Sequence, residues 1–213
     1  MKRRTKSYDG SRPIATGALT REVGGFLLDL TSQNFVEGDV IPAGTLARRD
    51  ESARKVLIIK TAKVKSIDAG DAKIVTLESD AFVGPIFAVG DKVLVTYTSS
   101  NTFANAPSIT AISDTASGYV ITLSAEISGL AAGDILQQVV ADGTKVKAYK
   151  ANCVVVSDTL IREDGNETIV DVCADTMQYA IYERRILPVV SAQKDATGFY
   201  LAENSHIRFT SML

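Results

Sequence analysis

The feature that most constrains this chain is its succession of short β-branched runs separated by turn residues. Runs of Val, Ile and Thr favour strands, and Gly, Asp, Asn and Ser between them mark turns. This spacing is typical of an all-β sandwich or barrel. We therefore predict a mainly β fold with a β-sandwich or barrel core. The predicted strands are residues 55–60, 63–67, 73–77, 92–97, 108–112, 119–123, 145–149 and 153–156.

Two segments repeat the same order of strands and turns. Residues 64–94 begin with a hairpin pattern and continue through Gly90-Asp91 into a third strand. Residues 109–136 repeat this order, with Gly133-Asp134 at the corresponding turn. Two copies are too few for a solenoid, so we predict a duplicated β-hairpin unit that closes on itself.

Two later segments carry more local signals. Residues 158–162 and 167–171 flank Glu163-Asp164-Gly165-Asn166, whose Asp-Gly and Gly-Asn steps suit a tight hairpin turn. Residues 176–187 fit a helix or a strand, and the β-rich surroundings favour a strand. Pro188 ends the element in either case.

The N-terminal residues 1–34 are basic at the front and contain several glycines, with one apolar cluster at Phe26-Leu27-Leu28-Asp29-Leu30. We interpret them as an extended arm, which either docks on a neighbouring surface or frays. The basic start at Lys2-Arg3-Arg4 is not followed by an apolar stretch, so no secretory signal peptide is predicted. The apolar runs are too short to cross a bilayer, so we expect no membrane partner.

Composition narrows the possible functions. The chain has 213 residues, 23 Lys and Arg against 25 Asp and Glu, one His, two Cys and no Trp. This charge balance argues against nucleic-acid binding, and the basic cluster Lys2, Arg3, Arg4 and Lys6 is interpreted as a solvated tail. One His and two Cys cannot build the usual all-protein His/Cys zinc sites.

Cys153 and Cys173 both lie in alternating apolar segments. They are interpreted as buried small hydrophobes, with a disulfide left open because it would need a close approach of the two strands.

No catalytic signature is present. The chain lacks nucleotide-binding loops, the nucleophile elbow and the HExxH zinc motif. His206 alternates with apolar residues in a terminal strand pattern, so a structural or surface role is predicted. We expect a non-enzymatic protein and assign no catalytic, cofactor-binding or metal-binding residue. Weaker candidate sites, which we do not assign, are three carboxylate pairs, a calcium-binding loop at residues 164–166 and a glycosylation pattern at residues 166–168. The carboxylate pairs are Asp68/Asp71, Glu163/Asp164 and Asp171/Asp175.

Three motifs resemble one protein family. Residues 37–47, Glu-Gly-Asp-Val-Ile-Pro-Ala-Gly-Thr-Leu-Ala, look like the strand that opens the core of tailed-bacteriophage head decoration and head fibre proteins. The Gly-Asp units, especially residues 121–136, are similar to β inserts of phage capsid proteins. Residues 182–189 and 206–209 resemble the family's C-terminal pattern.

This resemblance implies a virion structural protein on the capsid surface, made in the bacterial cytoplasm and assembled as a homo-oligomer, with a trimer favoured. Its partner would be the phage major capsid protein, and residues 1–34 would dock on the shell. Residues 35–60 with 141–213 would form the core, and residues 61–140 a projecting insert. The alternative is a β-sandwich module that binds host glycans or cell surfaces.

Overall fold

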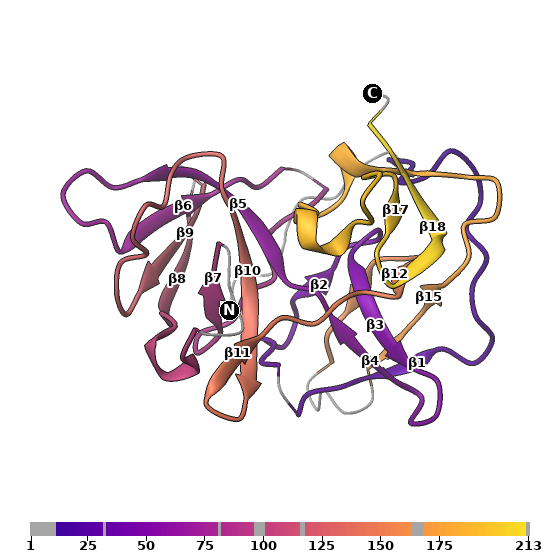
Figure 1. Cartoon of the computed structure of the whole chain (residues 1–213), viewed down its shortest axis with the longest axis horizontal. Helices are drawn as coiled ribbons and strands as arrows, with labels where there is room; N and C mark the ends of the chain where they lie inside the picture. The colour runs from indigo at the N-terminus through magenta and orange to yellow at the C-terminus, as the bar shows by residue number, and fades with distance from the viewer. Residues whose placement is uncertain are drawn as a thin grey trace.

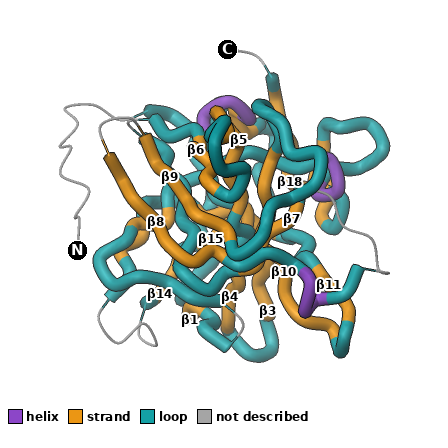
Figure 2. The backbone as a smooth tube through the Cα atoms, turned by 90° about the vertical axis from the view of Figure 1, so that its left-hand side faces the viewer, coloured by secondary structure: helices purple, strands orange, loops and turns teal. Residues whose placement is uncertain are grey.

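The computed structural model describes residues 12–31, 33–80, 82–95, 101–115, 118–162 and 168–211. The fold is mainly β, as predicted, with 41% strand and no α-helix in these ranges. Figure 1 shows two lobes side by side, the core lobe on the right and the second lobe on the left. Figure 2, from the side of the second lobe, shows strands and loops with only short helical turns.

The core lobe is built from both ends of the described chain. Its elements are β1 (Phe26–Leu28), β2 (Val40–Ile41), β3 (Leu46–Asp50), β4 (Lys55–Ile58), β12 (Cys153–Val155), β13 (Thr159–Leu160), β14 (Ile169–Val170), β15 (Val172–Cys173), β16 (Ile181–Tyr182), β17 (Tyr200–Leu201) and β18 (Asn204–Thr210), with 3-10 turns η2 (Glu183–Arg185) and η3 (Ser191–Gln193).

Six of these strands form a nearly closed sheet in the order β14-β1-β4-β3-β12-β15. The sheet curls round because β14 and β15, at opposite ends of that order, are separated in sequence only by Asp171. All six strands contribute to one buried cluster, which includes Phe26, Ile58 and Val155. This cluster is therefore the interior of a small barrel.

The outer face of this barrel is also buried. Alternate residues such as Leu46 and Val154 point away from the interior and pack with Ile207 and Phe209 of β18 in a second cluster. The three-stranded sheet β16-β18-β17 covers this face. The C-terminal segment therefore covers the outer face of the core barrel.

The second lobe is formed by the middle of the chain. Its elements are β5 (Thr61–Ile67), β6 (Ile74–Leu77), β7 (Lys92–Leu94), η1 (Phe103–Asn105), β8 (Ile109–Thr115), β9 (Gly118–Leu123), β10 (Ile135–Asp142) and β11 (Lys145–Lys147). Strand order is β11-β10-β5-β6-β9-β8, and β7 pairs with β10. A bridge between Lys92 and Ser108 brings β7 against β8 and closes the ring. Val64, Phe87 and Leu136 lie in its buried interior.

The duplicated units predicted from the sequence occupy corresponding places in this ring. The amide of Gly90 donates to the Ile109 carbonyl at 2.8 Å, and the amide of Gly133 donates to the Val64 carbonyl at 2.8 Å. Each copy's Gly-Asp turn thus pairs with the first strand of the other copy. The repeat closes on itself, as the sequence predicts.

The predicted insert boundary at residue 140 falls inside β10 (Ile135–Asp142). The strand continues past this point and pairs with β11 (Lys145–Lys147) in the same sheet. The second lobe's sheet therefore extends from Thr61 to Lys147.

The described part of the predicted arm, residues 12–31 and 33–34, lies along the core lobe. The amide of Thr16 donates to the Ala180 carbonyl at 2.9 Å, and the amide of Glu22 donates to the Val172 carbonyl at 2.9 Å. Within it, β1 pairs with both β14 and β4. These residues are therefore part of the core-lobe architecture. The basic cluster Lys2, Arg3, Arg4 and Lys6 lies outside the described residues.

The predicted hairpin of residues 158–162 and 167–171 is wrong. β13 (Thr159–Leu160) pairs with β2, whereas β14 (Ile169–Val170) pairs with β1. Both segments are strands, but each finds a more distant partner because local pattern does not specify the neighbour. The proposed turn at 163–166 lies outside the described residues, as do the Glu163/Asp164 pair and the calcium loop at 164–166.

Residues 176–187 form neither a continuous strand nor an α-helix. The favoured strand is present only as β16, which runs parallel to β18, and η2 follows directly. Met177 has a φ of 53°, which interrupts any regular element there.

The two cysteines are free and buried. Cys153 packs in the barrel interior and Cys173 in the cluster on the outer face. They therefore lie on opposite faces of the sheet, which confirms the interpretation as small hydrophobes rather than a disulfide.

Candidate functional site

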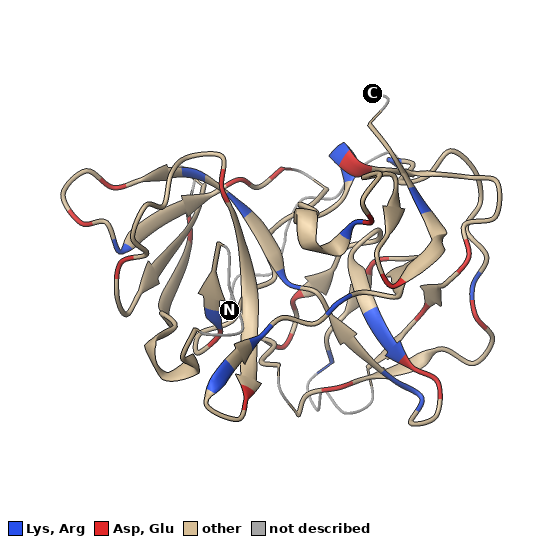
Figure 3. Cartoon of the chain, in the orientation of Figure 1, with Lys and Arg blue, Asp and Glu red and all other residues tan. Residues whose placement is uncertain are grey.

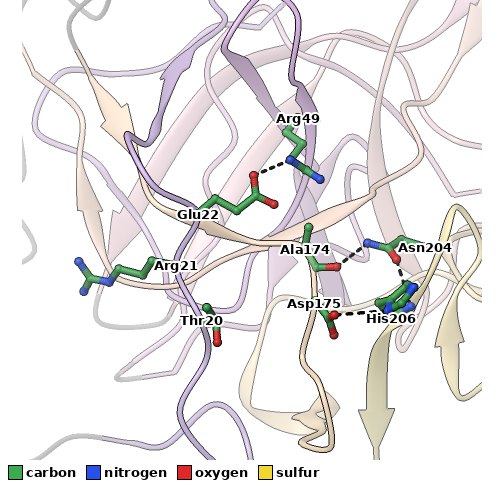
Figure 4. Close-up of a pocket in the computed structure, with 8 residues that line it drawn as sticks. All are labelled: Thr20, Arg21, Glu22, Arg49, Ala174, Asp175, Asn204 and His206. Carbon is green, nitrogen blue, oxygen red and sulfur yellow. Dashed lines mark hydrogen bonds and ion pairs between the residues drawn. The ribbon is translucent and has the colours of Figure 1, made fainter.

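A polar depression of about 350 Å³ lies on the core lobe where the N-terminal segment passes β15 and β18 (Figure 4). Its lining residues are Thr20, Arg21, Glu22, Arg49, Ala174, Asp175, Asn204 and His206. Most of its charged side chains are paired with other groups of the chain. Arg49 binds Glu22 at 2.5 Å, and Arg21 binds Asp171 at 2.8 Å.

His206 lies at the edge of this depression, on β18. Its Nδ1 is 3.4 Å from Asp175 Oδ2, and both side chains are more than half exposed. The Thr20 hydroxyl, which also lines the depression, donates instead to Met177 Sδ. The Thr176 hydroxyl donates to the main-chain carbonyl of His206 at 2.9 Å, but in the described part of the chain no hydroxyl or thiol is hydrogen-bonded to the His206 imidazole. The His–Asp pair therefore lacks the third group that a nucleophilic relay would need.

The remaining predicted carboxylates point to different partners. Asp68 Oδ1 accepts from the amides of Gly70 and Asp71 at 2.8 and 3.1 Å, and Asp71 Oδ1 accepts from the amide of Lys73 at 3.0 Å. Both carboxylates thus stabilise their own turn. Asp171 binds Arg21, and Asp175 lies beside His206. In neither pair, Asp68/Asp71 or Asp171/Asp175, do the two carboxylates face a shared ligand site.

A second polar cluster is buried at the seam between the two lobes. Lys60, at the crossing from β4 to β5, places Nζ 2.8 Å from Asp91 Oδ2, and both side chains have no exposed surface. Lys60 Nζ also donates to the Asn34 carbonyl and lies 4.1 Å from the centroid of the Phe35 ring. Gln138 Nε2 donates to the other carboxylate oxygen of Asp91 at 3.0 Å.

Gln33 extends this cluster into the core lobe. Its side chain accepts from the Ile58 amide at 2.8 Å and donates to Gln138 Oε1 at 2.8 Å. The side chain of Gln33 thus joins β4 of one lobe to β10 of the other. We call Gln33, Lys60, Asp91 and Gln138 the polar seam.

Burial sets the electrostatics of the polar seam. Loss of hydration lowers the pKa of Lys60 below its ordinary value, although the charge of Asp91 acts in the opposite direction. Burial also raises the pKa of Asp39, and the nearby charge of Lys60 partly offsets this. The polar seam is therefore a place where charge is costly.

The sequence interpretation missed the polar seam. Lys60 was assigned to the end of a strand and Asp91 to a turn. One sequence signal could have indicated that Lys60 is buried. It lies in the run Ile58-Ile59-Lys60-Thr61-Ala62, which lacks the alternation of apolar and polar residues that a surface strand shows.

The described surface also exposes three apolar side chains at β1, at the segment before it and at β14, namely Leu27, Val23 and Ile169, which we together call the apolar patch. Their exposed fractions are 41%, 94% and 58%. Leu27 of β1 and Ile169 of β14 are directly paired across the strands. The backbone beneath is held firmly, because Arg54 Nη2 donates to the carbonyls of Val23 and Gly25. The patch is thus an ordered apolar surface.

Elsewhere Lys and Arg are interspersed with Asp and Glu over both lobes in the view of Figure 3. Among the residues that the structure describes, no group of three or more His, Cys, Asp or Glu side chains could hold a metal ion. No helix within the same ranges combines the length and the apolar character needed to cross a membrane.

Comparisons with known proteins return no match: no family model, no curated protein and no solved structure is similar to this chain.

Proposed function

We propose that this chain is a non-catalytic virion structural protein that decorates a phage or prophage capsid. In this proposal it self-associates, with a trimer favoured, and docks on the major capsid protein. The phage assignment rests on the resemblance of residues 37–47, the Gly-Asp units and residues 182–189 and 206–209 to head decoration and head fibre proteins. The observation that carries the docking role is the ordered apolar patch.

Exposed apolar side chains on a firmly held strand pair favour a protein partner, because their burial gains free energy without a large ordering cost. Val23 and Leu27 belong to the N-terminal segment that the resemblance assigns to docking. The depression beside His206, by contrast, has its charged groups paired within the chain. These observations support an assembly role over a catalytic one.

The test is binding of the purified chain to shells assembled from the major capsid protein of the phage that carries its gene. The variant with Leu27→Asp and Ile169→Asp should bind at least about tenfold more weakly, because two charges would be buried in an apolar contact. Phe199→Asp is the matched control, since Phe199 is 59% exposed on the β17–β18 side of the core lobe. No binding by the wild-type chain would overturn the capsid proposal.

Unaltered binding by the patch variant would overturn the docking surface alone. Removal of residues 1–34 is a poorer test, because it deletes β1 from the middle of the core sheet. Removal of residues 1–11 leaves every described contact in place and tests the basic start separately. Sedimentation of the free chain tests self-association, and a monomer at all accessible concentrations would exclude the trimer.

The alternative function, a glycan- or cell-surface-binding module, has one observation in its favour. The depression is lined by the side chains of Asp175 and His206, which are both more than half exposed and could contact a polar ligand. A glycan array probed with wild type and with Asp175→Asn/His206→Ala tests it. Specific binding lost in the variant would favour this alternative, and silence across the array would remove it.

A further inference from the structure

We propose that Lys60 and Asp91 are condensed into an intramolecular isopeptide bond, a self-catalysed modification of the polar seam. The geometry that suggests it is a lysine nitrogen 2.8 Å from a carboxylate oxygen, with both side chains wholly inside the protein. The proposal is independent of the capsid assignment, since it concerns chemistry between two residues of the same chain.

The two groups are held in a fixed arrangement. Asp91 Oδ2 accepts from the Ala88 amide at 2.8 Å, and Oδ1 accepts from Gln138 Nε2 at 3.0 Å. Lys60 Nζ is held against Asp91 by the Asn34 carbonyl and the Phe35 ring. Such fixed proximity replaces a bimolecular encounter and raises the effective concentration of the amine by orders of magnitude.

The proposed step balances without any added reagent. A proton passes from Lys60 Nζ to Asp91 Oδ2 along their hydrogen bond, which leaves a neutral amine beside a neutral acid. Nζ then bonds to Cγ, the Cγ–Oδ2 bond breaks, and a second proton from Nζ leaves with Oδ2 as water. The ammonium and carboxylate together become one neutral amide and one water molecule.

The surroundings favour this product over the ion pair. Removing two charges from a buried site relieves their desolvation cost, and exclusion of water opposes hydrolysis of the amide. The Ala88 amide loses Oδ2 as its acceptor, but the polar atoms of the new amide have partners already in place. The single N–H of the new amide could donate to the Asn34 carbonyl, and its oxygen could accept from Gln138 Nε2.

The second copy of the repeat shows that the turn itself does not need the lysine. Asp134 Oδ2 accepts from the Ala131 amide at 2.8 Å, as Asp91 Oδ2 does from Ala88. In the part of the chain that the structure describes, no lysine or arginine forms a salt bridge with Asp134. Lys60 is thus an addition to a turn that is complete without it.

The experiment is the intact mass of the purified full-length chain after denaturation. We expect a mass lower than that of the sequence by one water molecule. Trypsin should then release residues 56–63, uncleaved after Lys60, joined to residues 74–92. Peptide mapping is needed because Asp-Gly steps such as Asp142-Gly143 can also lose water by cyclisation.

Two variants control the assignment. Lys60→Arg keeps a cation beside Asp91 but has a poor nucleophile, so it should show the full sequence mass. Asp134→Ala should lose water as the wild type does. A folded wild-type chain with its full mass and normal cleavage after Lys60 would overturn the proposal. Water loss that maps to any other residues would overturn it equally.

Discussion

The two Gly-Asp turns of the second lobe share one local design but have different surroundings. Gly90 and Gly133 have φ values of 94° and 97°, and the Asp that follows each accepts from the amide three residues earlier. Asp91, however, is 1% exposed and lies against Lys60 at the seam with the core lobe. Asp134 is only partly buried. A repeated sequence therefore reproduces a turn, whereas its position in the fold determines what chemistry the turn can carry.

The difference follows from which copy the core lobe touches. The first copy's turn precedes β7, which pairs with β10 beside Gln138 and Gln33. Burial there removes water from Asp91, so an ionised Asp91 carboxylate needs the Lys60 cation beside it unless the two groups have condensed to a neutral amide. The second copy's turn keeps contact with solvent and needs only its backbone hydrogen bond. Four predictions test this comparison.

The largest expected effect comes from removing each aspartate. Asp91→Ala leaves the Lys60 ammonium buried without a counter-charge and should lower the free energy of unfolding by at least about 3 kcal/mol. Asp134→Ala removes a turn hydrogen bond and should cost about 1 kcal/mol. Urea unfolding of both variants measures the difference. Equal losses would show that the surroundings of the two turns do not matter.

A double substitution tests whether the uncompensated charge causes that loss. Lys60→Met with Asp91→Asn removes both charges while the Asn side chain can still accept from the Ala88 amide. We expect it to be about 2 kcal/mol more stable than Asp91→Ala, because a neutral pair avoids the desolvation cost. Urea midpoints at equal m-values provide the comparison. A double variant as unstable as Asp91→Ala would point to lost packing instead.

Substitution of Gly90 and of Gly133 should lower stability by similar amounts, because the two turns share the same backbone conformation at these glycines. Gly90→Ala and Gly133→Ala each place a side chain at a left-handed backbone position, at a cost of about 1–2 kcal/mol. A Cβ at Gly133 would meet nothing within 4 Å, and one at Gly90 would lie 3.4 Å from Asn34 Nδ2, an ordinary contact. Thermal unfolding of the two variants should agree. A much larger loss at Gly90 would mean that the turns differ in backbone as well as in surroundings.

The smallest effect concerns Asp80, which precedes the first turn. Burial raises its pKa, but hydrogen bonds from Arg12 and from the amides of Val83 and Phe82 outweigh this and hold the pKa below its usual value. The resulting stability is present above the unfolded pKa of about 3.9 and is lost as pH falls through the folded value.

Asp80→Asn should therefore destabilise the chain by a few tenths of a kcal/mol at neutral pH, because the Asp80 side chain of this ion pair is half exposed to solvent. The difference in free energy of unfolding between this variant and the wild type should disappear below about pH 4. Unfolding curves at several pH values measure this. A gap that persists in acid would mean that the Asp80 charge is not its cause.

Local pattern was enough to place most strands and the repeat. Alternation in residues 63–67 and the β-branched run at residues 119–123 predicted strands that the structure contains as parts of β5 and β9. Pairing was less predictable. The strands at Thr159–Leu160 and Ile169–Val170 were recognised, but they pair with β2 and β1 rather than with each other. A strand's backbone hydrogen bonds are chemically alike for any neighbour, so long-range packing selects the partner.

The features of the candidate sites also separate into those that local sequence predicts and those that depend on long-range packing. The sequence by itself determined a mainly β chain, two matching Gly-Asp turns and one isolated histidine, because these follow from residue type and spacing. Only the tertiary structure decided that β1 lies inside the core sheet, that the cysteines face opposite sides, and that Lys60 meets Asp91. Those outcomes depend on which surfaces exclude water when distant segments pack, and no local pattern encodes that directly.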